Sequence, residues 1–337
     1  MSPLRQAEIR LSVLDTSPIV QGSTPKQALE NTVDLAILAD ALGYHRYWVP
    51  EHHSMRGVAS SAPAVLVGHL ADRTQHLRVG AGGVLLPNHA PIVVAEQFGT
   101  LAALHPGRID LGIGRAPGGP SSAVEAVRPE RERTAKTFRQ QLEELLAWFD
   151  PAPDARIKAV PVAGGNVPPI WLLGSSPNSA QLAAELGLAY AYAGHLNLEV
   201  TAEATRVYRE SAATPRMLVS LSVIVAEDDE RAEWLAGSTR LKVLSRVRGK
   251  RIQLPSPEDA AAYPYTEDDR AEIATRSAGV LAGSPDTVTK QLQKVLDDSG
   301  ADEIMVTTPV YDHADRRLSY ELLASIADRL SPKPLTA

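Results

Sequence analysis

The chain has no cysteine among its 337 residues and only three phenylalanines. The lack of cysteine excludes disulfides, thiolate metal sites and cysteine nucleophiles. Because phenylalanine is scarce, leucine, valine, isoleucine and alanine must fill the core. The net charge is −6 and the basic residues are spread along the chain, so the sequence has no footprint of a nucleic-acid-binding protein.

No segment has the pattern of a membrane anchor or an export signal. Residues 1–13 hold Arg5, Glu8 and Arg10 and lack the apolar stretch of a secretory signal. Residues 159–184 are uncharged and long enough to cross a bilayer, but their glycines and prolines would break a spanning helix. We therefore expect a soluble cytoplasmic protein with no membrane partner.

Apolar strand-like segments alternate with segments that have a helical face. The expected strands are residues 9–14, 44–49, 77–86, 108–113, 169–173, 188–193, 217–226 and 303–308. The expected helices are residues 25–41, 62–70, 92–104, 131–149, 178–186, 199–211, 286–298 and 317–330. Most of the strands are apolar nearly throughout, which is typical of a parallel sheet buried on both faces.

Eight such units in this length predict an α/β protein that forms one domain over residues 1–337, a (β/α)8 TIM barrel. A doubly wound sheet would need a Gly-x-Gly-x-x-Gly turn after its first strand, and Gly22 stands alone there. Residues 227–282 follow the seventh strand and form a long insertion. Its middle carries five basic residues, Lys242, Arg246, Arg248, Lys250 and Arg251. The segment is either a lid over the barrel mouth or a solvated helix and loop.

The triplet Glu51-His52-His53 follows the second expected strand, at the end of the sheet where α/β proteins place their chemistry. Histidine there suits general acid–base catalysis with support from the glutamate. Two adjacent imidazoles on an extended chain point to opposite sides, so they do not converge on a metal ion. The alternative is a polar strand end with one histidine hydrogen-bonded in the wall.

Two adjacent glycines, Gly82 and Gly83, lie inside the third expected strand. Glycine weakens a strand unless something approaches its backbone closely or the strand is bulged. A planar ring lying on the strand and a simple bulge explain the pair equally well.

A third group of residues suits an anion. Arg115 ends the fourth strand in a glycine-rich loop, where it could bind a phosphate or simply face water. Ser175, Ser176 and Ser179 lie at the turn from the fifth strand into a helix, where hydroxyl and N–H groups bind anions. Ser176 as an ordinary N-cap with Pro177 behind it explains the same residues without a ligand.

Taken in this order, the motifs resemble the bacterial-luciferase-like flavin monooxygenase family over essentially the whole chain. The match is closest to the subgroup of oxidoreductases whose substrates are mostly unassigned. The stretches that carry it are Trp48-Val49-Pro50-Glu51-His52-His53, Val79 to Pro87, Gly107 to Arg115, and Gly300 to Val306 followed by Tyr311-Asp312-His313 and Arg316.

The resemblance implies bound FMN with its ring at the strand ends, and reduced FMN supplied by a separate NAD(P)H-dependent flavin reductase. It makes His52 the catalytic residue with Glu51 as its orienting partner, and it places a non-proline cis peptide at Gly82–Gly83. Arg115, Ser175, Ser176 and Ser179 would hold the phosphate.

The resemblance further implies a two-component monooxygenase that acts with O2 on a small organic substrate, a homodimer, and a mobile lid at residues 227–282. A second phosphate-binding arginine is not clearly supplied, with Arg128, Arg131 and Arg133 as candidates, and light emission is not implied. The alternatives are a deazaflavin-dependent hydride-transfer enzyme, a non-catalytic flavin-binding protein, and a histidine–metal hydrolase.

Overall fold

A closed barrel of parallel strands forms the centre of the molecule. The computed structural model describes residues 9–116, 118–277 and 279–331. Strands β1 to β7 follow one another around the ring, and β9 closes it between β7 and β1. The predicted (β/α)8 barrel is confirmed. The strands are β1 (Arg10–Leu14), β2 (Arg46–Val49), β3 (Arg78–Leu85), β4 (Ile109–Gly114), β5 (Ile170–Gly174), β6 (Ala189–Tyr192), β7 (Met217–Val225), β8 (Val280–Gly283) and β9 (Glu303–Thr307).

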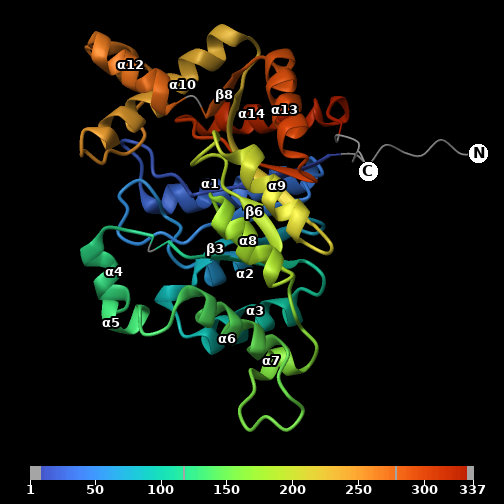
Figure 1. Ribbon diagram of the computed structural model, residues 1–337. Coiled ribbons are helices and arrows are strands. Elements are labelled where there is room, and N and C mark those ends of the chain that lie inside the picture. Colours follow the sequence, from blue (N-terminus) through green and yellow to red (C-terminus); the bar gives the residue numbers. More distant parts are fainter. Residues whose placement is uncertain (1–8, 117, 278, 332–337) are drawn as a thin grey trace, which may run out of the picture.

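Helices surround the barrel (Figure 1). The helices are α1 (Pro25–Ala41), α2 (Pro63–Arg73), α3 (Pro91–Leu104), α4 (Ser121–Val127), α5 (Glu130–Arg133), α6 (Phe138–Phe149), α7 (Val160–Ala163), α8 (Pro177–Glu185), α9 (Thr201–Ser211), α10 (Asp229–Val247), α11 (Pro257–Ala262), α12 (Glu267–Arg276), α13 (Pro285–Ser299) and α14 (His313–Ala324). No helix within the described part of the chain is long and apolar enough to cross a membrane.

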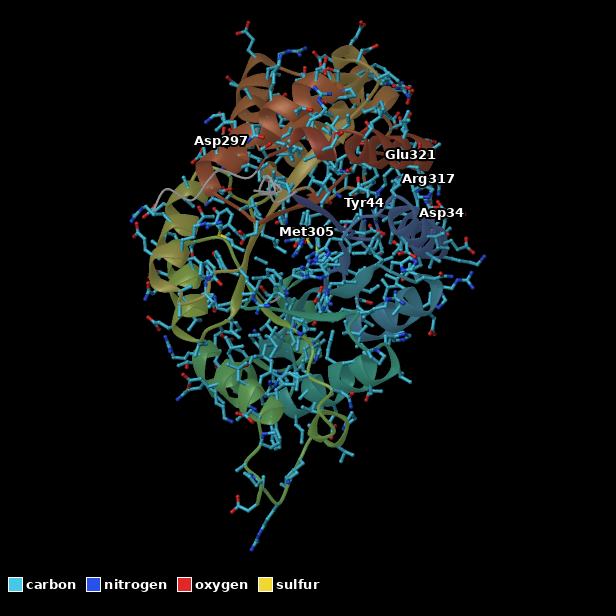
Figure 2. All side chains as sticks on the ribbon, turned by 90° about the vertical axis from the view of Figure 1, so that its right-hand side faces the viewer. Asp34, Tyr44, Asp297, Met305, Arg317 and Glu321 are labelled. Carbon is cyan, nitrogen blue, oxygen red and sulfur yellow. The ribbon has the colours of Figure 1, made fainter. Side chains whose placement is uncertain are left out.

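The barrel encloses a small core of its own, distinct from the larger core between strands and helices. Figure 2, viewed from the right-hand side of Figure 1, labels Met305 of β9 near the middle of the molecule. The side chains of this inner core are Leu14, Trp48, Trp171, Ala189, Ala191, Leu218 and Met305. They fill the barrel below the strand ends, so ligand chemistry is confined to its mouth.

A buried ion network crosses the inside of the barrel near the beginnings of the strands. Arg46 of β2 is 4% exposed and makes a two-pronged contact with Glu303 of β9, at 2.6 and 3.0 Å. Its remaining nitrogen donates to Asp110 of β4 at 2.6 Å. Ser12 of β1 also donates to Glu303, so four strands are linked by one buried guanidinium and its partners.

Strand β8 was missed in the sequence because it is short and lies inside the expected insertion. Strand β7 is nine residues long, and its first half pairs with β6 and β9. Its second half, from Ser222, runs past the barrel and pairs with β8 in parallel. The four residues of β8 give too little pattern to be recognised, whereas the unpaired half of β7 needs a partner.

Two helix predictions were wrong in their bounds. The helix expected over residues 131–149 is divided into α5 and α6, because Thr137 caps the N–H of Gln140 and so begins a new helix. The closing helix begins at His313 rather than residue 317, because the Asp312 side chain accepts from the N–H groups of Ala314 and Asp315. It ends at Ala324, and a short 3-10 turn follows at Ala327–Arg329.

The insertion is fastened to loops at the barrel mouth. Leu254, which follows α10, forms a parallel bridge with Val20, in the loop after β1. The amide of Gln253 donates to the carbonyl of Arg56, after β2, at 3.3 Å. Thr239 of α10 donates to the carbonyl of Pro309, after β9, at 2.8 Å. Contacts with three loops therefore hold the insertion against the ends of the strands.

Candidate active site at the barrel mouth

The polar residues expected from the sequence gather at one end of the barrel because every strand of the ring points the same way. His52 follows β2, the glycine pair lies in β3, Arg115 follows β4 and Ser175 follows β5. His195, which the sequence analysis did not single out, follows β6. The mouth is thus lined by residues from five consecutive strands.

His52 is a half-buried imidazole whose Nδ1 is buried without a hydrogen-bond partner among the described residues. Its backbone N–H donates to the carbonyl of Ser60 at 3.0 Å, which fixes the loop. Burial lowers the pKa of His52, and the charges of His53 and Lys242 lower it further against opposing contributions from the Gly118 backbone and Glu51. The ring is therefore neutral at pH 7 and one of its nitrogens is available to a ligand.

Among the described residues, Glu51 makes no hydrogen bond to His52, so the expected pairing of these two side chains is wrong. Its carboxylate accepts from the imidazoles of His53, at 2.7 Å, and His89, at 2.9 Å, and from the backbone N–H of Leu85. The extended backbone explains the change, because Glu51 and His53 share one side of the chain and His52 takes the other.

The Glu51 carboxylate is charged and buried, with 1% of the residue exposed. Burial by itself raises its pKa, but the hydrogen bonds from His89, Leu85 and His53 and the charge of His89 hold the pKa below its usual value. Glu51 therefore supports the wall of the mouth. His89 lies two residues beyond the stretch from Val79 to Pro87 and was given no role from the sequence, since no spacing rule links residues 38 positions apart.

The peptide bond between Gly82 and Gly83 is cis, as expected. The pairing of β3 with β4 shifts register between Ala81 and Val84, so the bulge interpretation is confirmed as well. A Cβ on Gly82 would lie 2.9 Å from Cβ of Trp48, and one on Gly83 would lie 2.7 Å from the carbonyl oxygen of Gly112. Close packing inside the barrel and against β4 thus requires glycine at both positions, with no ligand invoked.

The side chains of the expected anion site differ in whether they already have hydrogen-bond partners within the protein. Ser176 is the N-cap of α8, and Ser179 donates to the carbonyl of Ser176 at 2.7 Å and contacts the hydroxyl of Tyr190 at 2.9 Å. The capping interpretation is therefore confirmed. Ser175 and the exposed Arg115 make no hydrogen bond or ion pair with any residue that the structure describes. Because β4 and β5 are neighbours, these two free groups project from the same edge of the mouth.

Two of the three candidates for a second phosphate-binding arginine, Arg128 and Arg133, have structural partners, whereas Arg131 is exposed. Arg128 donates to the carbonyls of Pro87 and His89, at 3.1 and 2.8 Å. Arg133 donates to the carbonyl of Arg128 at 2.8 Å. Both therefore stabilise the segment that carries α4 and α5.

His195 is a second neutral imidazole at the mouth. The hydroxyl of Ser220 donates to the carbonyl of Tyr192 at 3.1 Å, so its oxygen accepts the Nδ1–H of His195 at 2.8 Å. That bond leaves Nε2 unprotonated, because a neutral imidazole has one N–H. Burial and the nearby charge of His52 lower the pKa of His195 to about 4. The strand-end rule that found His52 would have found His195 too.

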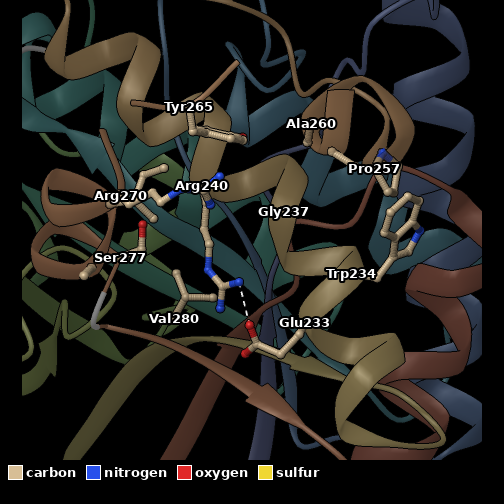
Figure 3. A pocket seen from close by; sticks show the side chains of 13 residues that line it. Glu233, Trp234, Gly237, Arg240, Pro257, Ala260, Tyr265, Arg270, Ser277 and Val280 are labelled. Atoms are coloured by element: carbon tan, nitrogen blue, oxygen red, sulfur yellow. Dashed lines mark ion pairs between the residues drawn. The ribbon is translucent and has the colours of Figure 1, made fainter. Parts of the chain in front are cut away.

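A cavity of about 640 Å³ lies inside the insertion, between α10, α11 and α12. Figure 3 shows the ion pair of Glu233 with Arg240 on one wall, and Arg270 stacks over the ring of Tyr265 on another. None of its lining residues follows a strand of the barrel ring, so we do not place the chemistry there. Within the described ranges, no group of three or more histidine, aspartate or glutamate side chains could hold a metal ion.

Comparison with known proteins agrees with this arrangement. Residues 9–303 match the model of the family described as luciferase-like monooxygenase. The chain belongs to that family. This luciferase-like chain is 40% identical to a luciferase-like monooxygenase of Escherichia coli K12, over 96% of this chain and 98% of the relative. It is 36% identical to the N-acetyl-S-alkylcysteine monooxygenase of Bacillus subtilis 168, over 94% and 97% of the two chains.

Among solved structures, apo-MsnO8 superposes on the luciferase-like chain with a TM-score of 0.89 at 39% identity. The alignment covers 96% of this chain and all of that one. The resemblance found in the sequence is thereby confirmed at the level of family and fold.

Proposed function

We propose that the chain is the oxygenase component of a two-component, FMN-dependent monooxygenase, with His52 as its catalytic residue. The observation that carries the proposal is the buried Nδ1 of His52, which has no partner in the described structure and lies at the mouth of a luciferase-like barrel. Reduced FMN would supply the electrons that place one oxygen atom of O2 in the substrate and release the other as water.

The residues present fit that cofactor. Ser175 and Arg115 have uncommitted polar groups on one edge of the mouth, where a phosphate would bind. The neutral ring of His52 can hold or accept a proton beside the reacting atoms. The insertion, fastened over the strand ends, would act as the lid that keeps water out. Ser176 and Ser179 would act by holding the start of α8 in place, since their hydroxyls and their backbone N–H groups are all used in the capping box.

The test compares His52→Gln with His53→Gln in protein loaded with FMN and supplied with NADH, a flavin reductase and oxygen. An N-acetyl-S-alkylcysteine is the first substrate to try, because a relative is named for it. We expect His52→Gln to lower product yield by about 100-fold or more, as loss of an acid–base group does. His53→Gln keeps the His89 contact to Glu51 and should lose less.

The same experiment separates the alternatives. Unchanged product yield and unchanged release of hydrogen peroxide in His52→Gln would falsify the assigned role. Binding of a deazaflavin in preference to FMN, without oxygen-dependent turnover, would favour hydride transfer instead. Tight retention of FMN without turnover with any reductase would favour a flavin-binding protein. The proposed homodimer is checked by light scattering of the purified chain.

A further inference from the structure

Lys242 differs from the other basic residues near the end of α10. Arg246, Arg248, Lys250 and Arg251 are exposed, whereas Lys242 is half-buried. The side chain is turned inward because Leu235, Thr239 and Lys242 recur at helical spacing on one face of α10. Thr239 on that face donates to the carbonyl of Pro309 at the mouth. Lys242 is therefore on the face of the insertion that covers the strand ends.

The ammonium group of Lys242 lies over the β1–β2 side of the mouth. Its Nζ is 3.6 Å from the position that a Cβ on Gly57 would occupy, in the loop after β2. Gly57 itself accepts the N–H of Ile19, from the loop after β1. The charge of Lys242 also reaches the ring of His52, whose pKa it lowers.

Among the described residues, no acidic side chain forms an ion pair with this ammonium group, and no group accepts a hydrogen bond from it. Burial lowers the pKa of Lys242, as does the like charge of Arg246. The acids nearest the ends of β1 and β2 are committed elsewhere. Asp15 pairs with Arg316 at 2.6 Å, and Glu51 holds His53 and His89. A partly buried cation without a counter-ion indicates that a ligand supplies the anion.

We propose that Lys242 binds a carboxylate of the organic substrate, so that the substrates of this enzyme are organic acids. The inference rests on the proposed function, since it assigns the substrate class of the same site. Bound at Lys242, the acid lies beside His52, and its other end extends over the mouth.

The phosphate of FMN is not the anion in question. Its proposed partners Arg115 and Ser175 follow β4 and β5, whereas Lys242 covers the loops after β1 and β2. The ring order places β3 between these two edges on one side and β6, β7 and β9 on the other. The mouth therefore has two separate anion sites, one for the cofactor and one for the substrate.

The test measures binding by calorimetry rather than turnover. Carboxylates from butanoate to decanoate, each with its matching neutral amide, are titrated into FMN-loaded and FMN-free protein. The variants are Lys242→Met, which keeps the length of the side chain, Lys242→Arg, which keeps the charge, and Lys250→Met, a control on an exposed lysine. We expect the wild type to prefer an acid over its amide by about tenfold or more, as a desolvated charge pair provides.

Lys242→Met should abolish this preference, while Lys242→Arg and Lys250→Met should retain it. The inference is overturned by equal affinity for acid and amide throughout the series, by absence of binding of both, or by a preference that survives in Lys242→Met. It is also overturned if Lys242→Met weakens FMN binding instead. Failure of FMN to bind the wild type contradicts the proposed function alone, because the acid preference is still measured in the FMN-free protein.

Discussion

Four histidines near the mouth show how one side chain takes different roles according to its partners. His53 and His89 both contact the carboxylate of Glu51 and support the wall. His195 is held through Nδ1 by Ser220, which leaves its Nε2 as an acceptor. His52 keeps a buried nitrogen without a partner in the described structure. The hydrogen bonds, more than position at a strand end, decide which imidazole is free for chemistry.

His195 should make stability depend on pH. Its pKa is about 4 in the folded chain, against 6.5 for an unperturbed histidine. Between these values the unfolded chain binds a proton that the folded chain does not, so acid favours unfolding. We expect the free energy of unfolding to fall with decreasing pH through this window, by up to about 1.4 kcal/mol per pH unit from this group. Above pH 6.5 the group contributes no slope.

Urea unfolding of wild type and His195→Gln at several pH values measures this contribution. Glutamine can still donate to Ser220. Below pH 6.5, the free energy of unfolding of the variant should depend less steeply on pH, by the contribution of at most one bound proton. His45 has a pKa lowered to about 4 as well, but it is present in both proteins and cancels. His69→Gln, on the exposed side of α2, should keep the wild-type slope. Identical slopes in wild type and His195→Gln would contradict the prediction.

The sequence predicted which strand ends carry polar residues but not which of them contact one another. The position of His52 after β2 and the cis bond at Gly82–Gly83 were expected and found. The pairing of Glu51 with His89 and the inward turn of Lys242 were not, because both depend on how distant segments pack. Local pattern specifies which way a side chain points along its own strand, whereas its partner comes from another element.

At the scale of elements, the start of α8 carries a capping residue, Ser176, next to Ser175, which we propose to bind the cofactor. Ser176 caps the helix, and its replacement by alanine should cost about 1 kcal/mol of stability. Ser175 has no hydrogen-bond partner among the described residues, so its hydroxyl is the one that we propose binds the FMN phosphate. The two serines are adjacent and similar in burial, which makes them matched controls for each other.

We therefore expect Ser175→Ala to weaken FMN binding by about tenfold, as loss of a hydrogen bond to a charged group does, with little change in stability. Ser176→Ala should lower the urea midpoint instead. Fluorescence titration with FMN and urea unfolding of both variants check the assignment. An FMN affinity unchanged in Ser175→Ala would show that its hydroxyl does not hold the cofactor.

Helices and strands with a long apolar pattern were predicted well. Those whose ends or existence depend on a capping side chain or on a distant strand were predicted poorly. Seven barrel strands and the closing strand β9 follow from apolar runs. The break between α5 and α6 comes from the side chain of Thr137, a signal that a helical face over residues 131–149 conceals. Strand β8 exists because β7 extends beyond its neighbours, which cannot be known before the barrel is built.

At the scale of the whole molecule, the buried ion network ties together strands that are far apart in the sequence. Arg46 contacts Glu303, 257 residues away, and Asp110, 64 residues away. The network joins the closing strand to the first half of the barrel. A buried cation that contacts two carboxylates leaves both of them short of a partner when it is removed.

Replacement of Arg46 by methionine should therefore cost about 3–5 kcal/mol, since it leaves the buried Glu303 carboxylate with the hydroxyl of Ser12 as its remaining partner among the side chains described. The double variant Arg46→Met with Glu303→Leu should regain part of this loss, because no charge is then left unpaired. Arg206→Met breaks an exposed pair with Glu210 and should cost less than about 0.5 kcal/mol. Urea unfolding of the three variants measures these differences, and a loss below about 1 kcal/mol for Arg46→Met would mean that the network contributes little to closing the barrel.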